Sequence, residues 1–260
     1  MHDSDLLALR NGELVIEGQL AEASNQVYLA QIQSDPITRV IYKPVRGERE
    51  LWDFPAHSLS GREVAAFIID QALGLNMVPP TTWRDDAPYG PGSVQLLIVN
   101  DHDNDDDHPV GVSETAPAAS LQIVSLEDRA GNQWVLHHKD DPRLRRIALF
   151  DSIINNADRK AGHILVAGDG LFLIDHGVTF HSESKLRTVL WGWAGEPLNS
   201  AEIAWLRQSR ADMYAQASNV TRFLSGEEWE ATKARFDSLI ALARFPVPTD
   251  EWPALPWPLF

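Results

Sequence analysis

The pattern of hydrophobic and polar positions begins with three short apolar stretches separated by loops of small and polar residues. Residues 13–20 (ELVIEGQL), 27–32 (VYLAQI) and 38–45 (TRVIYKPV) are rich in Val, Ile, Leu and Tyr. Short runs of this kind, bounded by polar connections, are typical of β-strands. The sequence therefore predicts an antiparallel meander of three strands at the start of the chain.

A helical spacing replaces this pattern after residue 60. The apolar residues that share one helix face are Val64, Phe67, Ile68 and Ala72. We expect this helix to have Ser60 as its N-cap and to end at Gly74, because serine favours the N-cap and glycine favours the position after the last turn. Residues 92–100 (GSVQLLIVN) follow the break at MVPPT and predict a further strand.

An acidic segment then interrupts the apolar pattern. It contains five aspartates in seven residues and continues into small, proline-containing sequence. Dense like charge with little hydrophobicity favours a flexible linker, so residues 101–120 are expected to separate an N-terminal lobe (1–100) from a C-terminal lobe (121–260). His102 and His108 could bind a metal there, but a flexible loop is not a closed metal site.

The second part of the chain is predicted to be mostly helical. The expected helices are residues 142–156, 182–193, 200–214 and 225–245, with Ser200 and Ser225 as N-caps. The Pro- and Trp-rich tail, residues 247–260, is expected to pack against these helices.

Composition narrows the possible functions. The 260 residues include no cysteine, which excludes disulfides, thiolate zinc sites and cysteine nucleophiles and is compatible with a reducing cytoplasm. No signal sequence or long apolar run occurs, so a cytoplasmic protein without membrane insertion is expected. A net charge of −15 without a dense basic patch makes nucleic acid a poor partner, whereas a nucleotide can still bind through a metal ion.

The candidate chemistry lies in residues 151–180. Asp158 and Asp175 are seventeen residues apart, and the two apolar runs between them, split by Gly-Asp-Gly, predict a paired ribbon that holds both carboxylates at one end. With Arg159, Lys160 and His163 beside them, they could hold a divalent metal and a polyphosphate. The alternative is that both aspartates are turn or capping residues.

Two upstream residues bear on this choice. Lys43 lies within the third predicted strand, where an exposed strand lysine is the ordinary alternative. Glu63 lies at the edge of the apolar helix face, where a first-turn acid favoured by the helix dipole is the alternative. The functional interpretation is that Glu63 pairs with Lys43 and that the two form the ion pair that positions phosphates in kinase-type folds.

In this order the elements resemble the phosphatidylinositol 3-/4-kinase branch of the protein-kinase-like superfamily and its bacterial relatives. The likeness is closest to type II phosphatidylinositol 4-kinases, in GREVAAFIIDQALGLNMVPPT, GSVQLLI, LFDSIINNADR and LIDHGVTF. It covers roughly residues 13–185. The resemblance implies an α+β, two-lobed protein-kinase-like fold, with an N-terminal antiparallel sheet plus one helix and a mainly helical C-terminal lobe.

The resemblance also implies a role for each matching residue. Lys43, held by Glu63, would contact the α- and β-phosphates of ATP. Asp158 would accept or orient the acceptor hydroxyl, Asp175 would bind Mg²⁺, and Arg159 would stabilise the catalytic loop or the transferred phosphate. The hinge strand that meets adenine would comprise Gln95, Leu96, Leu97 and Ile98.

Three positions depart from the family pattern. His163 replaces the second metal-binding asparagine, and imidazole suits Mn²⁺ better than Mg²⁺. The phosphate-covering loop lacks glycine, so Ser24 and Asn25 would contact the nucleotide. His176 replaces the phenylalanine that follows the metal-binding aspartate. His163, His176 and His181 could instead form a metal site with Asp175, although this spacing matches no mechanistic motif.

The sequence therefore predicts an ATP- and Mg²⁺- or Mn²⁺-dependent kinase that phosphorylates a hydroxyl of a soluble, inositol- or polyol-like molecule or of a protein. Alternatives are a pseudokinase, a nucleotide-binding regulatory module, or a kinase-fold enzyme that transfers AMP. A membrane lipid is disfavoured by the acidic charge and the absence of a basic amphipathic surface. Trp191, Trp193 and Arg187 could line the acceptor site, but core packing is the ordinary role of such tryptophans.

Overall fold

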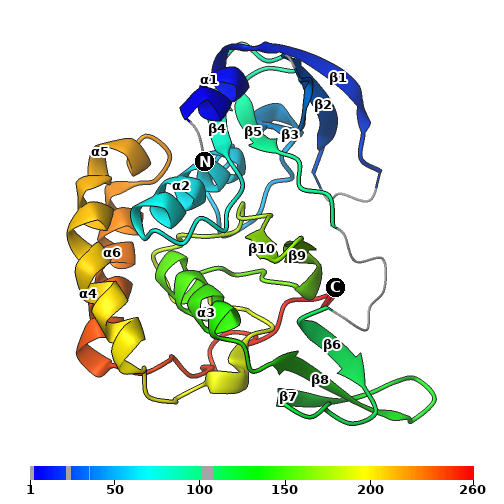
Figure 1. Ribbon diagram of the computed structural model, residues 1–260, viewed down its shortest axis with the longest axis vertical. Helices are drawn as coiled ribbons and strands as arrows, with labels where there is room; N and C mark the ends of the chain where they lie inside the picture. Colours follow the sequence, from blue (N-terminus) through cyan, green and yellow to red (C-terminus); the bar gives the residue numbers. More distant parts are fainter. Residues whose placement is uncertain (1–2, 22–24, 35, 101–107) are drawn as a thin grey trace.

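The three predicted N-terminal strands form one edge of a five-stranded antiparallel sheet (Figure 1). The computed structural model describes residues 3–21, 25–34, 36–100 and 108–260. The sheet has the order β1-β2-β3-β5-β4, and its strands are β1 (Glu13–Gln19), β2 (Tyr28–Gln33), β3 (Thr38–Pro44), β4 (Thr81–Arg84) and β5 (Gly92–Leu96). A short helix that the sequence pattern did not predict, α1 (Asp3–Asn11), precedes β1, and its Leu9 is buried against this sheet.

Helix α2 (Leu59–Ala72) lies beneath the sheet and faces the C-terminal lobe. The prediction of Ser60 as its N-cap is wrong, because Ser60 already lies in the first turn. The Glu48 carboxylate supplies the cap instead, accepting from the N–H groups of Leu59 (3.1 Å) and Ser60 (2.6 Å). The predicted end is confirmed, since Gly74 follows with a positive φ of 67° that glycine adopts without strain.

The C-terminal lobe contains four helices within the described residues, and α4 to α6 lie along one side of it (Figure 1). They are α3 (Pro142–Ile154), α4 (Ser200–Ala215), α5 (Ala217–Val220) and α6 (Gly226–Leu242). Ser225 caps α6 as predicted, but Asn199 rather than Ser200 caps α4; each cap forms a reciprocal capping box with a glutamate three residues later.

The helix predicted over residues 182–193 is wrong. The segment is extended and ends in a single 3-10 turn, η4 (Trp191–Trp193). Its main chain bonds to other segments: Arg187 N–H donates to Asn156 O, and Val189 N–H donates to Arg159 O. These long-range partners replace the local bonds of a helix.

A second sheet in the C-terminal lobe was also not predicted. It has the order β6-β8-β7 and comprises β6 (Val110–Ser113), β7 (Ser120–Glu127) and β8 (Gln133–Lys139). Strand β6 lies where the sequence analysis expected linker. Of the two histidines considered as metal ligands there, His102 lies outside the described residues, whereas His108 lies within hydrogen-bond distance of the carbonyls of Val110 and Ile164.

The predicted ribbon is confirmed as β9 (Ile164–Ala167) paired antiparallel with β10 (Gly170–Leu173), preceded by the 3-10 turn η3 (Ala161–His163). It lies between the two lobes (Figure 1). The C-terminal tail packs against this lobe, with Leu259 buried and its carbonyl accepting from Ala161 N–H at 2.8 Å. Trp193 is 1% exposed in the same core. Within the described ranges, no helix combines the length and apolar character needed to cross a membrane.

Candidate functional site

Lys43 connects the two lobes. It lies on β3, and its ammonium forms ion pairs with Glu63 on α2 and, at 3.0 Å, with Asp175 just after β10. Glu63 is almost fully buried and also accepts from His176 N–H at 2.9 Å. Asp175 has a φ of 60°, a left-handed conformation that aspartate tolerates better than most residues. The structure thus brings together three predicted site residues that are up to 132 positions apart in the chain.

The Lys43 ammonium and the Asp175 carboxylate stabilise each other's charged form. Burial acts to lower the pKa of Lys43, but the carboxylates of Asp175 and Glu63 outweigh it and raise that pKa above its ordinary value. The Lys43 ammonium in turn holds the pKa of Asp175 well below its usual range. Lys43 is therefore a cation and Asp175 an anion throughout the neutral pH range.

His163 faces the same carboxylate from η3. Its Nε2 lies 3.4 Å from Asp175 Oδ2, and burial lowers the pKa of His163 to about 4, so the ring is neutral at pH 7. Two donor atoms that bind one cation at roughly 2.0–2.2 Å each can lie this far apart. His163 and Asp175 therefore fit a shared divalent metal, which would neutralise phosphate charge. The remaining metal ligands would be water and phosphate oxygens.

Asp158 lies in the loop between α3 and η3. Its N–H donates to Asn156 Oδ1 at 3.0 Å, and its carboxylate forms an ion pair with Lys160 at 3.1 Å. Burial raises the pKa of Asp158, while the Lys160 ammonium acts in the opposite direction. Sequence reasoning did not identify Asn156, whose side chain positions this loop by also donating to buried Asp151.

Arg159 lies beneath the site and not in it. Its side chain is fully buried, forms an ion pair with equally buried Asp151 at 3.0 Å, and donates to the carbonyls of His163 and Ile174. The guanidinium thereby joins the Asp158 loop to the end of β10. Of the two roles expected for Arg159, this geometry supports loop stabilisation, and contact with a transferred phosphate is not supported.

His176 packs under the Lys43–Glu63 pair. It is fully buried, its Nε2 lies 2.9 Å from a guanidinium nitrogen of Arg159, and its ring meets Phe150 edge-on. Because the guanidinium can only donate, Nε2 accepts and the ring proton is on Nδ1. Burial lowers the pKa of His176 well below its ordinary value, so a neutral ring fills the place of the expected phenylalanine.

The residues expected to contact the nucleotide from the hinge and the phosphate-covering loop differ in whether their polar groups are already hydrogen-bonded. Gln95 is buried and its amide donates to Thr81, while Leu97 N–H donates to Arg39 O, so these groups are already bonded. Leu96 ends β5, and only the main chain at Ile98 makes no hydrogen bond within the part of the chain that the structure describes. Asn25 accepts from Arg49 N–H at 2.7 Å. Ser24 lies outside the described residues.

The alternative metal cluster does not assemble. His181 Nε2 lies 2.9 Å from Asp53 O, and His176 Nε2 accepts a hydrogen bond from Arg159. Among the described residues, no group of three His, Cys, Asp or Glu side chains is arranged to hold a metal by itself. A metal held by His163 and Asp175 would need ligands from a bound phosphate or water.

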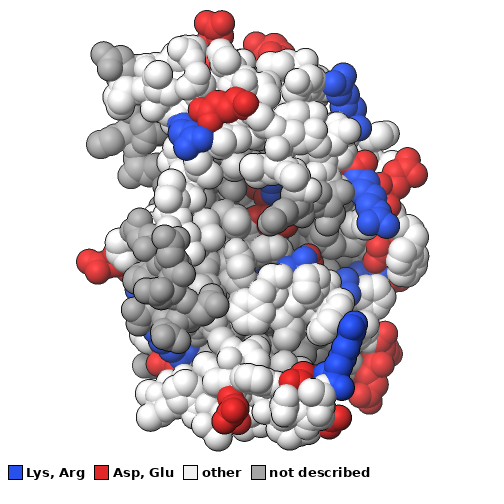
Figure 2. Space-filling model, turned by 90° about the vertical axis from the view of Figure 1, so that its right-hand side faces the viewer, with Lys and Arg blue, Asp and Glu red and all other residues white. Residues whose placement is uncertain are grey.

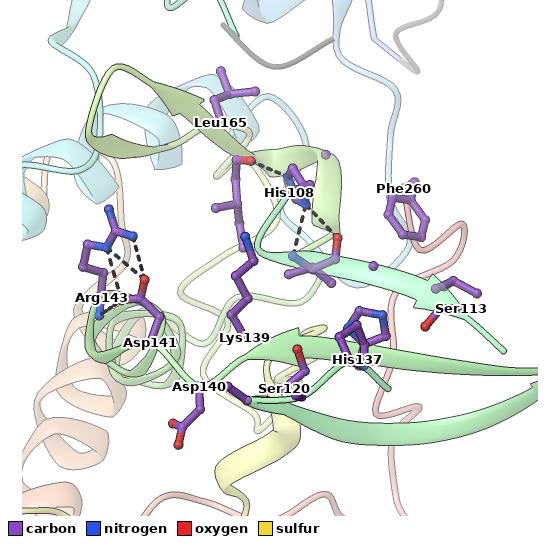
Figure 3. Close-up of a pocket in the computed structure, with 18 of the residues that line it drawn as sticks. His108, Ser113, Ser120, His137, Lys139, Asp140, Asp141, Arg143, Leu165 and Phe260 are labelled. Carbon is purple, nitrogen blue, oxygen red and sulfur yellow. Dashed lines mark hydrogen bonds and ion pairs between the residues drawn. The ribbon is translucent and has the colours of Figure 1, made fainter. Parts of the chain in front are cut away.

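The site opens to solvent between the lobes, where Figure 2 shows a hollow that contains both basic and acidic side chains. A separate cavity of about 1250 Å³ lies beside β9 and the three-stranded sheet, and His108, His137, Lys139 and Phe260 contribute to its lining (Figure 3). Lys43, Asp158 and Asp175 do not line that cavity.

Comparison of the fold with solved structures confirms a protein-kinase-like fold. A Golgi casein kinase, also solved with Mn/ADP bound, matches with a TM-score of 0.54 over 92% of this chain and 74% of that chain, at 14% identity. A hydra Fam20 solved with sugar matches with a TM-score of 0.58 over 93% of this chain and 90% of that chain, also at 14% identity. At such identities the likeness shows the fold alone.

Comparison of the sequence with those of known proteins shows the family to which the chain belongs. Protein Rv2133c of Mycobacterium tuberculosis is 39% identical over 273 residues, covering 100% of this chain and 97% of that protein. The chain belongs to the same family as this mycobacterial protein. Phosphatidylinositol 4-kinase gamma 3 of Arabidopsis thaliana is 31% identical over 56% of this chain, but this chain spans only 27% of the plant enzyme. No protein-family model matches the chain.

Proposed function

We propose that this protein is an ATP-dependent phosphotransferase that uses Mg²⁺ or Mn²⁺ and moves the γ-phosphate to a hydroxyl of a soluble small molecule, inositol- or polyol-like, or of a protein. The observation that carries the proposal is the position of Lys43, which bridges Glu63 and Asp175 across the lobes while Asp158 lies free of that pair. The kinase-like fold and the distant likeness to phosphatidylinositol 4-kinases support it.

In this proposal each charged group has one task. Lys43 holds the α- and β-phosphates, and Asp175 with His163 holds the metal that neutralises the phosphate oxygens. Ile98 and the adjoining hinge main chain meet adenine, and Asn25 borders the phosphates. Lys160 stabilises the transferred group beside Asp158, which accepts or orients the acceptor hydroxyl. Rate acceleration comes from positioning and charge neutralisation.

Nucleotide binding and product analysis test the proposal together. ATP with metal at about 100 times its dissociation constant should stabilise the fold by about 2.7 kcal/mol in a thermal-shift assay. Detection of ³¹P should then show ADP in the presence of acceptor. Stabilisation without any turnover would indicate a pseudokinase or nucleotide-binding regulatory module, and pyrophosphate in place of ADP would indicate AMP transfer. The absence of any nucleotide-induced shift would refute the proposal.

The replacement of asparagine by His163 predicts a metal preference. Imidazole nitrogen binds Mn²⁺ better than Mg²⁺, so the ratio of activities with Mn²⁺ and Mg²⁺ should exceed that of His163→Asn. His57→Asn, which changes an exposed histidine outside the site, is the matched control. An unchanged ratio in His163→Asn would remove His163 from the metal site while leaving the phosphotransferase proposal standing.

A further inference from the structure

Arg187 is fixed beside the Asp158 loop. Its N–H donates to Asn156 O at 2.9 Å, and its carbonyl accepts from Arg159 N–H at 3.0 Å. Its side-chain Nε donates to Ala157 O at 2.8 Å, which is the carbonyl immediately before Asp158. Two main-chain bonds thus fix the Arg187 backbone, and the Nε bond holds the guanidinium next to the Asp158 loop.

The Nη donors of Arg187 have no hydrogen-bond or ion-pair partner among the described residues. Neighbouring Arg159, Lys160 and Lys185 each pair with a carboxylate within 3.1 Å, whereas Arg187 has no carboxylate at salt-bridge distance among the described residues. Its Nη groups likewise have no hydrogen-bond partner there. A guanidinium presents five N–H donors in a planar fork that matches carboxylate or phosphate oxygens. The Arg187 guanidinium therefore has donors that could bind an anionic group, since no carboxylate of the described residues occupies them.

Two indoles from distant segments border the same place. Trp252 of the C-terminal tail lies with its ring centroid 5.3 Å from the Arg187 guanidinium carbon. Trp52, from the segment before α2, lies 6.5 Å from Trp252 and is 86% exposed. Lys185 fixes both rings, with its ammonium 4.9 Å from the Trp52 centroid and 4.1 Å from that of Trp252, while pairing with Asp53.

Arg187, Trp52 and Trp252 carry only hydrogen-bond donors, and the nearby Asp53 carboxylate pairs with Lys185. Indole N–H groups and guanidinium N–H groups cannot accept, and the Nη groups of Arg187 are the donors that remain available to a ligand, because Trp252 Nε1 is itself buried. A ligand here must therefore supply acceptor oxygens, and an exposed indole face suits the C–H face of a small carbon framework. The Arg187 charge also acts to lower the pKa of Asp158, consistent with its nearness to that carboxylate.

We infer that Arg187, Trp52 and Trp252 form the acceptor subsite, and that the acceptor is a polyol bearing a phosphate or carboxylate group. This inference rests on the proposed function. The anionic group binds Arg187, the carbon framework lies on the indoles, and a hydroxyl reaches Asp158. That hydroxyl loses its proton to Asp158 as its oxygen bonds to the γ-phosphorus, and the bond from the γ-phosphorus to the bridging oxygen breaks to release ADP.

Paired probes test the subsite by calorimetry: inositol against inositol 1-phosphate, and glycerol against glycerol 3-phosphate and glycerate. Each is titrated into the full-length protein with and without a non-hydrolysable ATP analogue and Mn²⁺. We expect the wild type to bind the anionic members at least tenfold more tightly than the neutral ones. Arg187→Gln should abolish most of this preference and leave nucleotide affinity within twofold, and Arg187→Lys should restore part of it.

Two further variants separate charge from stacking. Trp52→Ala, at an exposed position, should weaken the binding of neutral and anionic probes by a similar factor. The ratio of their two affinities should therefore stay the same. Arg129→Gln, in the exposed turn between β7 and β8, should change nothing. Thermal unfolding of each variant checks that it is folded.

The possible outcomes are distinct. A wild type that binds nucleotide but shows no anionic preference, or a preference that Arg187→Gln retains, overturns the inference and leaves the proposed function standing. A loss of nucleotide affinity in folded Arg187→Gln assigns Arg187 to the nucleotide and also overturns it. An Arg187-dependent preference without nucleotide binding keeps the anion subsite and refutes the kinase proposal. Preference for phosphate over carboxylate probes, or the reverse, identifies the anionic group.

Discussion

Asp175 and Asp158 lie at the same end of the β9–β10 ribbon, but the charges around them differ. Asp175 pairs with Lys43 and faces His163, which keeps its carboxylate ionised. Asp158 has Lys160 alone as an ion-pair partner in the described chain, and burial raises its pKa. A permanent anion suits a metal ligand, and a carboxylate with a raised pKa suits a proton acceptor. The comparison shows how one ribbon can present two acids with separate tasks.

Removing the proton acceptor should have the largest effect. Asp158→Asn keeps the size of the side chain but cannot accept a proton, so we expect phosphate transfer to fall by about 10²–10⁴-fold. ATP affinity should stay within twofold because Asp158 lies outside the Lys43 pair. Rapid measurement of ADP formation and calorimetry of ATP binding check this. Asp169→Asn, at the exposed turn of the same ribbon, should behave as wild type, and full transfer by Asp158→Asn would refute the assigned role.

Arg159 joins the Asp158 loop to the segment that carries Asp175, so its removal should lower the stability of the fold. Arg159→Met leaves Asp151 buried without its counter-charge, and the free energy of unfolding should fall by about 3–5 kcal/mol. Arg143→Met breaks an exposed pair with Asp141 and should cost no more than about 1 kcal/mol. Urea denaturation measures both. Equal losses in the two variants would contradict the structural role given to Arg159.

Replacing Asp175, the proposed metal ligand, should make nucleotide binding independent of added metal. In Asp175→Asn, the stabilisation by ATP should no longer increase when Mn²⁺ or Mg²⁺ is added, because the charged metal ligand is gone. Thermal shifts with ATP alone and with ATP plus metal measure the difference, and Asp169→Asn again serves as the control. A metal dependence equal to that of the wild type would exclude Asp175 as a ligand.

The smallest expected effect is a shift in the pH dependence of activity when Lys160 is replaced. The Lys160 ammonium lowers the pKa of Asp158, so Lys160→Met should raise that pKa further above its ordinary value. Since the ionised carboxylate is the active form, activity on the acidic side should be lost at a higher pH than in the wild type. The pH profile of kcat/KM measures this shift, with Lys233→Met as the control, because Lys233 is a partly exposed lysine on α6 that pairs with Glu230. A shift to lower pH would contradict the assignment of the base.

Much of the fold followed from local patterns because the deciding interactions are local. Strand runs, the helix period and the Gly-Asp-Gly turn predicted β1, β2, β3 and β5 of the N-terminal sheet, the helices α2, α3, α4 and α6, and the β9–β10 ribbon; β4 was not predicted. Predictions failed where a distant residue decides. Glu48 caps α2 from outside the helix, and residues 182–193 follow the Asp158 loop instead of forming their own helical bonds.

The sequence by itself determined the candidate site residues and their order, because Lys43, Glu63, Asp158 and Asp175 indicate a nucleotide site only in that combination. Only the tertiary structure decided which arginine and lysine side chains near the site pair with carboxylates and which have donors left for a ligand. Arg159 and Arg187 have the same side chain, yet Arg159 lies buried against Asp151, whereas Arg187, beside the Asp158 loop, has no carboxylate partner in the part of the chain that the structure describes. The physical reason is that burial and pairing depend on segments brought together by folding, which no local pattern records.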